Sequence, residues 1–297
     1  MELSAFELFT TVFLREAPIF KKTFWDVQGE FGAAWQFEFD IHLLKLFALD
    51  AAAYQNAVRG YAKFAIDAMR LQRRFNQTLT YEDVSYEQAC ERVYLNEEYM
   101  LNLYLPGIFI SHFLWRHHYR HFLYYKKRFL PLLDVNPDKR FYEVGTGTGF
   151  YTLQALRHDP RCHGYGIDIS PFSRRFTRQH VETWGYGDRL SSLDVDILTT
   201  PLEPLPCVQS VEVLEHLRDP QAFLLALRKL LAPGGYGFIT AAITAPEADH
   251  IYLYWTSDDV IEQLRHAGFT VNDFVEERAY EGAPGEHVPK VAAFIVS

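Results

Sequence analysis

The stretch that most constrains the fold is FYEVGTGTGF, residues 141–150, in which an apolar run ends at glycines that alternate with threonine. Glycine permits a sharp turn and lets a ligand approach the backbone, because it carries no Cβ. The preceding RFYEV has the pattern of a short buried strand, and the following FYTLQALRH that of a helix. A strand, a glycine turn and a helix in this order predict a nucleotide-type site at the carboxyl end of a parallel strand.

The chain beyond residue 137 alternates short apolar strands with helical segments. This alternation predicts a parallel sheet with helices on both faces, an α/β, Rossmann-like fold over residues 138–297. The last two strands are joined by the loop AYEGAPGEH, which has no room for a crossover helix, so we expect them to pair antiparallel. The expected strands are RFYEVG, HGYGIDI, LSSLDV, CVQSVEVL, YGFITAAI, FTVNDFVEE and VAAFIVS.

Residues 1–137 have helical periodicity instead and are rich in aromatic residues, so we expect an all-α N-terminal domain. We expect it to cap the carboxyl edge of the sheet, to close an acceptor pocket, and to offer a surface for a homodimer. One amphipathic helix is indicated by apolar residues at steps of three and four, namely Tyr61, Phe64, Ala68, Leu71 and Phe75.

Two further helices are expected in this domain. Ser85 and Gln88 have capping-box spacing and begin a helix that should run to Leu105, where Pro106-Gly107 would stop it. The next helix should pass through SHFLWRHHYRHFLYYKKRFL and end before Pro131.

Composition and charge narrow the classes of function. A chain of 297 residues with 48% hydrophobic residues can bury a sizeable core. The formal net charge of −9 gives no general attraction to phosphate backbones, so a nucleic-acid partner is disfavoured.

The sequence also bears on location. The N-terminal apolar stretch is interrupted by Glu7, Arg15 and Glu16, which is not typical of an export signal. The apolar run at 103–115 is too short for a transmembrane segment. The three cysteines are widely spaced and odd in number, which favours neither disulfides nor a thiolate metal site. We therefore expect a cytoplasmic protein.

Acidic residues stand where they would face a bound nucleoside. Glu143, two residues before the first glycine, would repel a pyrophosphate, and Phe150 occupies the place of the third glycine of the dinucleotide fingerprint. Asp168 ends the second expected strand, where a carboxylate can accept from both ribose hydroxyls. Asp196, after the third, is placed to accept from an adenine amine. These positions describe S-adenosylmethionine, an adenosine with a cationic, amino-acid-like tail.

Five motifs, YEVGTGTG, GIDIS, DVDIL, VEVLEHLRDP and LRKLLAPGGYGFITA, resemble those of class I S-adenosylmethionine-dependent methyltransferases in order and spacing. The resemblance implies a seven-stranded sheet with the glycine turn around the methionine and ribose. It implies that the cofactor-binding residues are Glu143, Gly145, Thr146, Gly147, Gly149, Asp168, Ile169, Asp196, Ile197 and Glu212.

The motif EVLEH places Glu212, Glu215 and His216 at i, i+3 and i+4, so that one helical turn would gather them, and His250 follows the fifth strand on the same edge. Two carboxylates and two imidazoles suit Mg²⁺ or Mn²⁺. The pattern is similar to the metal site of small-RNA 2′-O-methyltransferases, and EVLEH followed by DP also resembles ubiquinone-pathway O-methyltransferases. Alternatively, the two glutamates make structural hydrogen bonds, and His216 or His250 is the catalytic acid–base or positioning residue.

A second histidine group, His117, His118 and His121, lies in WRHHYRH. His117 and His121 have a spacing that can bind metal, but Arg116 and Arg120 make the segment electropositive. We expect a solvated or acceptor-facing basic helix face here.

The sequence as a whole predicts a methyltransferase that acts on a small apolar or aromatic metabolite in natural-product biosynthesis. O-methylation is preferred, with N- and C-methylation left open. The alternatives are a metal-dependent RNA-terminal O-methyltransferase, a Rossmann-type oxidoreductase, and a non-catalytic methyltransferase-like scaffold.

Overall fold

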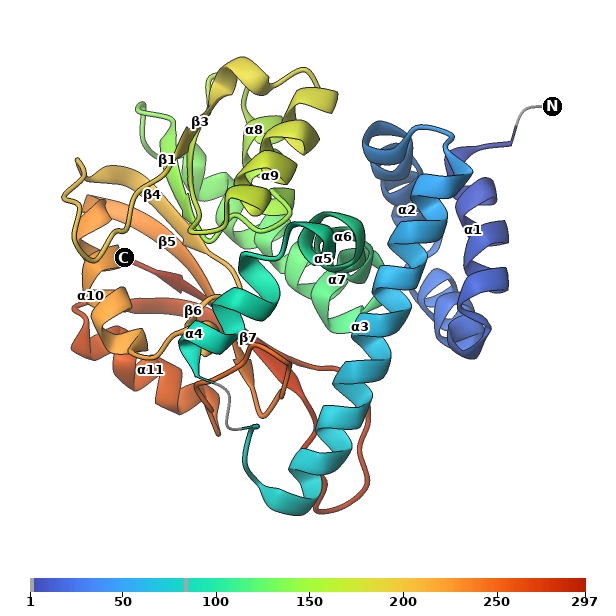
Figure 1. Cartoon of the computed structure of the whole chain (residues 1–297). Coiled ribbons are helices and arrows are strands. Elements are labelled where there is room, and N and C mark those ends of the chain that lie inside the picture. The colour runs from blue at the N-terminus through green and yellow to red at the C-terminus, as the bar shows by residue number, and fades with distance from the viewer. Residues whose placement is uncertain (1–2, 83–84) are drawn as a thin grey trace.

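The structure is a computed structural model that describes residues 3–82 and 85–297 (Figure 1). Within them, seven strands form one sheet in the order β3-β2-β1-β4-β5-β7-β6. Strands β1 to β5 pair in parallel, and β7 lies antiparallel between β5 and β6. This confirms the expected strands and the antiparallel pair. They are β1 (Arg140–Val144), β2 (His163–Ile167), β3 (Leu190–Leu193), β4 (Leu205–Ser210), β5 (Leu231–Ile243), β6 (Val271–Arg278) and β7 (Lys290–Val296).

Helices cover both faces of the sheet, as the alternating pattern predicts (Figure 1). One face carries α10 (Pro220–Leu230) and α11 (Ser257–His266), and the other carries α8 (Phe150–His158) and α9 (Pro171–Thr183). Every residue of β4 is buried, as expected for a central parallel strand that is covered on both sides.

The N-terminal helices, which we call the cap, lie within residues 5–134. None of the helices in the described part of the chain is long and apolar enough to cross a membrane. The longer cap helices are α1 (Ala5–Glu16), α2 (Lys21–Phe47), α3 (Ala51–Thr78), α6 (Leu105–Leu114) and α7 (Arg116–Tyr124). Short turns between and after them are η1 (Pro18–Phe20), α4 (Tyr86–Ala89), η2 (Cys90–Tyr94), α5 (Glu97–Tyr99), η3 (Met100–Tyr104), η4 (Tyr125–Phe129) and η5 (Leu130–Asp134).

Helix α3 confirms the amphipathic helix expected around Tyr61. Tyr61 and Phe75 are buried in the core, as predicted. Phe64 and Ala68, expected on the same buried face, instead line the large cavity of the molecule. The helix therefore contributes one edge of its apolar face to the core and another to the cavity wall.

The helix that begins at Ser85 is shorter than predicted. Its capping box with Gln88 is present, but the helix does not run to Leu105. Asn96 interrupts it, because the Asn96 side chain accepts from the Tyr99 N–H at 3.1 Å and caps a new turn. The result is a chain of short turns over residues 86–104, which we call the strap.

Pro106-Gly107 does not stop a helix, so that prediction was wrong. Both residues lie in the first turn of α6, where proline needs no N–H partner. A Cβ on Gly107 would lie 2.8 Å from the backbone of Gly60 in α3, so the glycine permits two helices to cross closely.

The expected helix through residues 111–130 is also divided. Trp115 has extended backbone angles and separates α6 from α7. Pro131 does not follow the end of the helical region, as predicted, but lies in the 3-10 turn η5. Proline is tolerated there because it occupies the first turn.

The cap and the sheet share one hydrophobic core. The ring of Tyr125 packs edge-on against Tyr151 and Phe238 with ring centroids 4.9 Å away in each case. Phe113 of α6 packs against Phe150 of α8 in the same cluster. The division into residues 1–137 and 138–297 stays a prediction about the chain, since no gap separates the two parts in the core.

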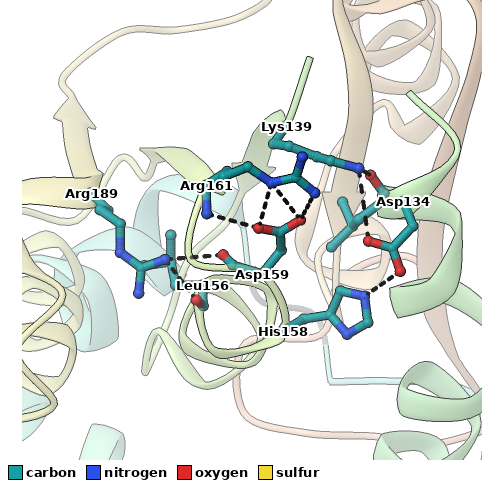
Figure 2. A network of polar contacts seen from close by, with 8 residues as sticks. Asp134, Lys139, Leu156, His158, Asp159, Arg161 and Arg189 are labelled. Atoms are coloured by element: carbon teal, nitrogen blue, oxygen red, sulfur yellow. Dashed lines mark hydrogen bonds and ion pairs between the residues drawn. The ribbon is translucent and has the colours of Figure 1, made fainter. Parts of the chain in front are cut away.

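Polar contacts join the two parts at the amino end of β1 (Figure 2). The Lys139 ammonium donates to the Leu133 carbonyl at 2.8 Å and lies 3.7 Å from an Asp134 carboxylate oxygen. His158 Nε2 lies 2.9 Å from the other Asp134 oxygen. The last cap turn is thereby held against α8, at the end of β1 opposite to the glycine turn.

Candidate functional site

The glycine turn adopts backbone angles that other residues rarely reach. Gly145, Gly147 and Gly149 have φ of +79°, +50° and +68°. A Cβ on Gly145 would lie 2.3 Å from a Val213 methyl, and one on Gly149 2.7 Å from a Thr177 methyl. A Cβ on Gly147 would meet no atom within 4 Å. Two glycines therefore permit close packing of the protein, and the middle one faces the open space where a ligand fits.

Glu143 lies beneath this turn and is 2% exposed. Its Oε2 accepts from the Thr152 hydroxyl and, at 3.0 Å, from Gln209 Nε2. Burial raises the pKa of Glu143 to about 8, although these hydrogen bonds oppose the rise. Both side-chain bonds end on Oε2, so Oε1 is left for a ligand, and a cationic group would favour the ionised form.

Asp168 and Asp196 occupy the expected edge of the sheet, and both line the cavity. Asp168 Oδ2 accepts from the Gly147 N–H at 3.0 Å, and Oδ1 accepts from the Ser170 N–H at 2.8 Å. The carboxylate thus fixes the glycine turn and keeps lone pairs for a ribose. Asp196 is exposed and accepts from the Leu198 N–H at 2.9 Å.

A single cavity of about 1510 Å³ runs along the carboxyl edge of the sheet and under the cap. Pockets for drug-sized ligands usually have volumes of about 300–1,000 Å³, so this space is large enough for two such ligands. Of the predicted cofactor residues, Gly149 alone does not line it, because it packs on Thr177. Those that do are Glu143, Gly145, Thr146, Gly147, Asp168, Ile169, Asp196, Ile197 and Glu212.

EVLEH does not form the helical turn that its spacing predicts. Glu212 has φ +52°, and only Leu214–His216 make a 3-10 turn. The Glu212 carboxylate accepts from the Thr240 hydroxyl, whose oxygen accepts from the Glu212 N–H at 2.8 Å. Burial raises the pKa of Glu212 to about 7. Strand β5 therefore holds the Glu212 carboxylate, which is not among the ligand atoms that converge near His216.

The remaining three predicted metal ligands do converge. Ligand atoms of Glu215, His216 and His250 lie within 4.8 Å of one another. Two ligands of one ion are at most about 4.6 Å apart when each bond is about 2.3 Å. Glu215 Oε1 is buried without a hydrogen-bond partner in the described part of the chain, and it lies 4.0 Å from His216 Nε2. The spacing of these donor atoms is therefore slightly wider than one divalent ion requires.

Burial and charge differ among these three residues. Burial, and then the neighbouring Glu212, raise the pKa of Glu215 well above its usual value. Burial lowers the pKa of His250 to about 3, and its Nδ1 donates to the Ala245 carbonyl at 2.6 Å. His250 is consequently neutral, with its lone pair on Nε2.

Three residues that sequence reasoning missed surround His216. Asp249 Oδ2 accepts from the hydroxyls of Tyr94 at 2.8 Å and Tyr104 at 3.0 Å. The Tyr94 hydroxyl lies 2.9 Å from His216 Nδ1. Asp249 could have been predicted from the sequence, because it is adjacent to His250. Nothing in the helical pattern distinguishes the two tyrosines from the other aromatic residues of the cap.

The histidines of WRHHYRH are not a solvated face. His117 and His121 are 6% and 3% exposed, and with His118 they line the cavity. Burial lowers the pKa of His117 to about 3 and that of His121 to about 4, so both are neutral. Arg116, which also lines the cavity, and Arg120 pair with Glu30 at 2.9 and 2.6 Å. The solvated alternative was wrong, because these histidines are buried against the cavity, and the acceptor-facing alternative stays a prediction.

Comparisons with known proteins agree with this geometry. Residues 142–236 match the family described as a methyltransferase domain. The ubiquinone biosynthesis O-methyltransferase of Cereibacter sphaeroides is 30% identical over 148 residues, which cover 43% of this chain and 59% of that protein. The tRNA U34 carboxymethyltransferase of Dichelobacter nodosus is 29% identical over 126 residues, which cover 41% and 39%. The chain thus spans less than two thirds of these relatives.

Two solved structures share the fold. The N-methyltransferase NodS from Bradyrhizobium japonicum, in complex with S-adenosyl-l-homocysteine, is 21% identical with a TM-score of 0.50, covering 71% of this chain and 98% of NodS. PigF with SAH is 10% identical with a TM-score of 0.52, covering 81% of this chain and 73% of PigF. The parts of this chain that NodS and PigF cover, 71% and 81%, are longer than the segment that matches the family. The similarity of fold therefore extends beyond residues 142–236.

Proposed function

We propose that this chain, which carries a methyltransferase domain and has the class I methyltransferase fold, methylates a small acceptor molecule with S-adenosylmethionine. The observation that carries the proposal is the single cavity in which the glycine turn, Glu143 and Asp168 face the aromatic cap. A cavity that joins a nucleoside-type site to a second space lined by the cap suits transfer between two bound ligands.

The residues along the sheet edge fit the cofactor. Glu143 Oε1 would hold the amino group, Asp168 the ribose hydroxyls, and Asp196 the adenine amine, with Ile169 and Ile197 against the rings. When bound, the sulfonium supplies a methyl group that is already activated for displacement. The protein's task is to align the acceptor and to exclude water.

The cap favours an apolar or aromatic acceptor. Phe64 and Trp115 stack at 5.0 Å in the cavity wall, and Tyr61 lies in the same wall. The neutral histidines of α7 add hydrogen-bonding groups without charge. A small metabolite of natural-product biosynthesis, with an oxygen nucleophile, fits this lining best.

Of the two histidines near the acceptor, we assign His216 as the base that removes the acceptor proton. His250 is a weak base, because burial lowers its pKa to about 3. His216 lines the cavity with its side chain 17% exposed, and its Nδ1 is already engaged, so Nε2 is the free basic atom. His250 is then a positioning residue next to it, with ring centroids 4.7 Å apart.

A metal-dependent O-methylation of an RNA end is the second candidate function. The convergence of Glu215, His216 and His250 is the observation that favours it, with Mg²⁺ or Mn²⁺ as the ion. The net charge of −9 and the aromatic cap oppose an RNA acceptor.

The decisive experiment has two steps on the purified chain. Calorimetry first measures the binding of S-adenosylmethionine. The formation of S-adenosylhomocysteine is then measured with a panel of phenols, hydroxylated metabolites, amines and short RNA. We expect binding in the micromolar range or tighter and turnover with a hydroxylated aromatic. A chain that binds the cofactor but methylates only RNA would establish the second candidate. A chain that binds no S-adenosylmethionine would refute both.

We also propose that the cap helices mediate a homodimer. Ile19, Phe37 and Leu44 are large apolar side chains of the cap with exposures of 64%, 67% and 47%. Exposed apolar side chains of this size are common at subunit contacts. Light scattering after gel filtration measures the oligomeric state, and a monomer at micromolar concentration contradicts the proposal.

A further inference from the structure

The imidazole of His216 is surrounded at Nδ1 by oxygen atoms from three directions. The Tyr94 hydroxyl lies at 2.9 Å, the Asp249 carbonyl at 3.1 Å, and Asp249 Oδ2 at 3.5 Å. Its Nε2 has no hydrogen-bond partner among the described residues, and its nearest acidic neighbour is Glu215 Oε1 at 4.0 Å. The two ring nitrogens therefore have very different surroundings.

These contacts decide which nitrogen carries the proton. A carbonyl and a carboxylate can only accept, so Nδ1 must donate. The Tyr94 hydroxyl uses its own proton on Asp249 Oδ2, at 2.8 Å, and so presents a lone pair to Nδ1. Burial raises the pKa of Tyr94 and of Tyr104 well above the usual tyrosine value, so both remain hydroxyl donors.

Asp249 is the centre of this arrangement and is 2% exposed. Its Oδ2 accepts from both tyrosine hydroxyls, at 2.8 Å from Tyr94 and 3.0 Å from Tyr104. A buried carboxylate that accepts two hydroxyl bonds has a fixed orientation. It consequently fixes the Tyr94 hydroxyl as well.

The strap delivers these hydroxyls to the sheet edge. Tyr94 ends η2 and Tyr104 ends η3, whereas Asp249 follows β5. The carbonyl of Tyr94 accepts from the Ser170 hydroxyl at 2.8 Å, and the Ser170 N–H in turn donates to Asp168. One strap residue, Tyr94, therefore contacts both the cofactor side and the acceptor side of the cavity.

We propose that Asp249 and Tyr94 are positioning residues that hold His216 in the Nδ1–H tautomer, with the basic Nε2 lone pair facing the acceptor. The acceptor site is complete only when the strap lies on the sheet edge, because Tyr94 comes from the cap. This inference rests on the proposed role of His216, but the tautomer is a property of the protein alone.

The first test is spectroscopic and needs neither cofactor nor acceptor. Long-range nitrogen–proton NMR spectra distinguish the two tautomers, and a His216→Gln variant assigns the signal among the 12 histidines. We expect the Nδ1–H form in the wild type. In Asp249→Asn the amide can donate to Tyr94 and turn its hydroxyl proton towards Nδ1, so the Nε2–H form should become detectable. A wild type in the Nε2–H form, or identical spectra for both proteins, overturns the proposal.

The second test separates positioning from general stability. Tyr94→Phe keeps the ring and removes the hydroxyl, and Tyr99→Phe is its control, because the Tyr99 hydroxyl has no partner in the part of the chain described and does not line the cavity. We expect kcat to fall about tenfold in Tyr94→Phe and about 100-fold in Asp249→Asn, with S-adenosylhomocysteine affinity and acceptor KM unchanged. Equal kcat in Tyr94→Phe and Tyr99→Phe contradicts the proposal.

The two tests also distinguish this inference from the proposed function. A wild type that binds no S-adenosylmethionine refutes the function, while the NMR spectra still decide the tautomer. Where an Asp249 variant unfolds below the assay temperature, Tyr94→Phe supplies the answer, because its single missing oxygen leaves the aromatic packing in place.

Discussion

Gln209 Nε2 donates to Glu143 Oε2 at 3.0 Å, and the same Gln209 accepts from the Tyr125 hydroxyl at 2.7 Å through its Oε1. A cap residue is thus linked by one side-chain amide to the carboxylate beneath the glycine turn. The amide fixes Glu143 Oε2 and leaves Oε1 for the ligand. Because Oε1 is the atom that meets the ligand, ligand binding should change the protonation of Glu143, and this change can be measured.

Binding of S-adenosylhomocysteine should release a proton. In the unliganded protein burial holds the pKa of Glu143 at about 8, so the carboxyl is largely protonated near pH 7. The ligand's ammonium group favours the carboxylate and lowers this pKa, so affinity rises as the pH increases towards about 8 and then levels off. Calorimetry in two buffers of different ionisation enthalpy measures the proton. Glu143→Gln should abolish its release and weaken binding about tenfold.

Asp168→Ala should weaken binding of S-adenosylhomocysteine by about 1.5–3 kcal/mol for each ribose hydrogen bond that is lost. Asp194→Asn is the control, because that carboxylate is 79% exposed, lies outside the cavity and contacts Arg174. Asp168 also accepts from the Gly147 and Ser170 N–H groups, so the melting temperature of both variants is needed. Unchanged affinity in Asp168→Ala would remove the ribose assignment.

Chelation should leave the rate of methyl transfer unchanged. Metal ligands must be deprotonated, but Glu215 is fully buried, its pKa is raised well above normal, and it does not line the cavity. We therefore expect equal rates with and without EDTA, and no calorimetric signal for Mn²⁺. Loss of activity that Mn²⁺ restores, and that Glu215→Gln makes permanent, would transfer the role of the base from His216 to a bound ion.

Gly107→Ala should destabilise the protein by about 1–3 kcal/mol, because the added Cβ would lie 2.8 Å from the backbone of Gly60. Gly29→Ala is the matched change, since Gly29 is exposed, lies in α2 just before its kink at Gly32, and a Cβ there meets no atom within 4 Å. That variant should be stabilised by about 0.5–1 kcal/mol. Urea unfolding of both variants measures the difference, and equal effects would show that α3 and α6 do not cross as closely as described.

The local sequence determined the sheet and the cofactor edge. Residues 291–296 of β7 are apolar on both faces, and the glycines at 145, 147 and 149 require a tight turn, so short-range pattern was sufficient. Asp168 and Asp196 follow strand ends, and the carboxyl ends of parallel strands meet at one edge. These predictions depended on spacing within about 30 residues of chain, which is the size of a βαβ unit.

Tertiary structure decided the acceptor side. Thr240 of β5 holds the Glu212 carboxylate, so Glu212 does not join Glu215 and His216 as the spacing of EVLEH predicts. Tyr94 reaches His216 across 122 positions of sequence, and no periodicity encodes a contact of that separation. Whether a histidine is a basic surface group or a neutral wall residue, as His117 is, depends on what packs over it. Burial and long-range contacts arise from the packing of the cap on the sheet, which local pattern does not specify.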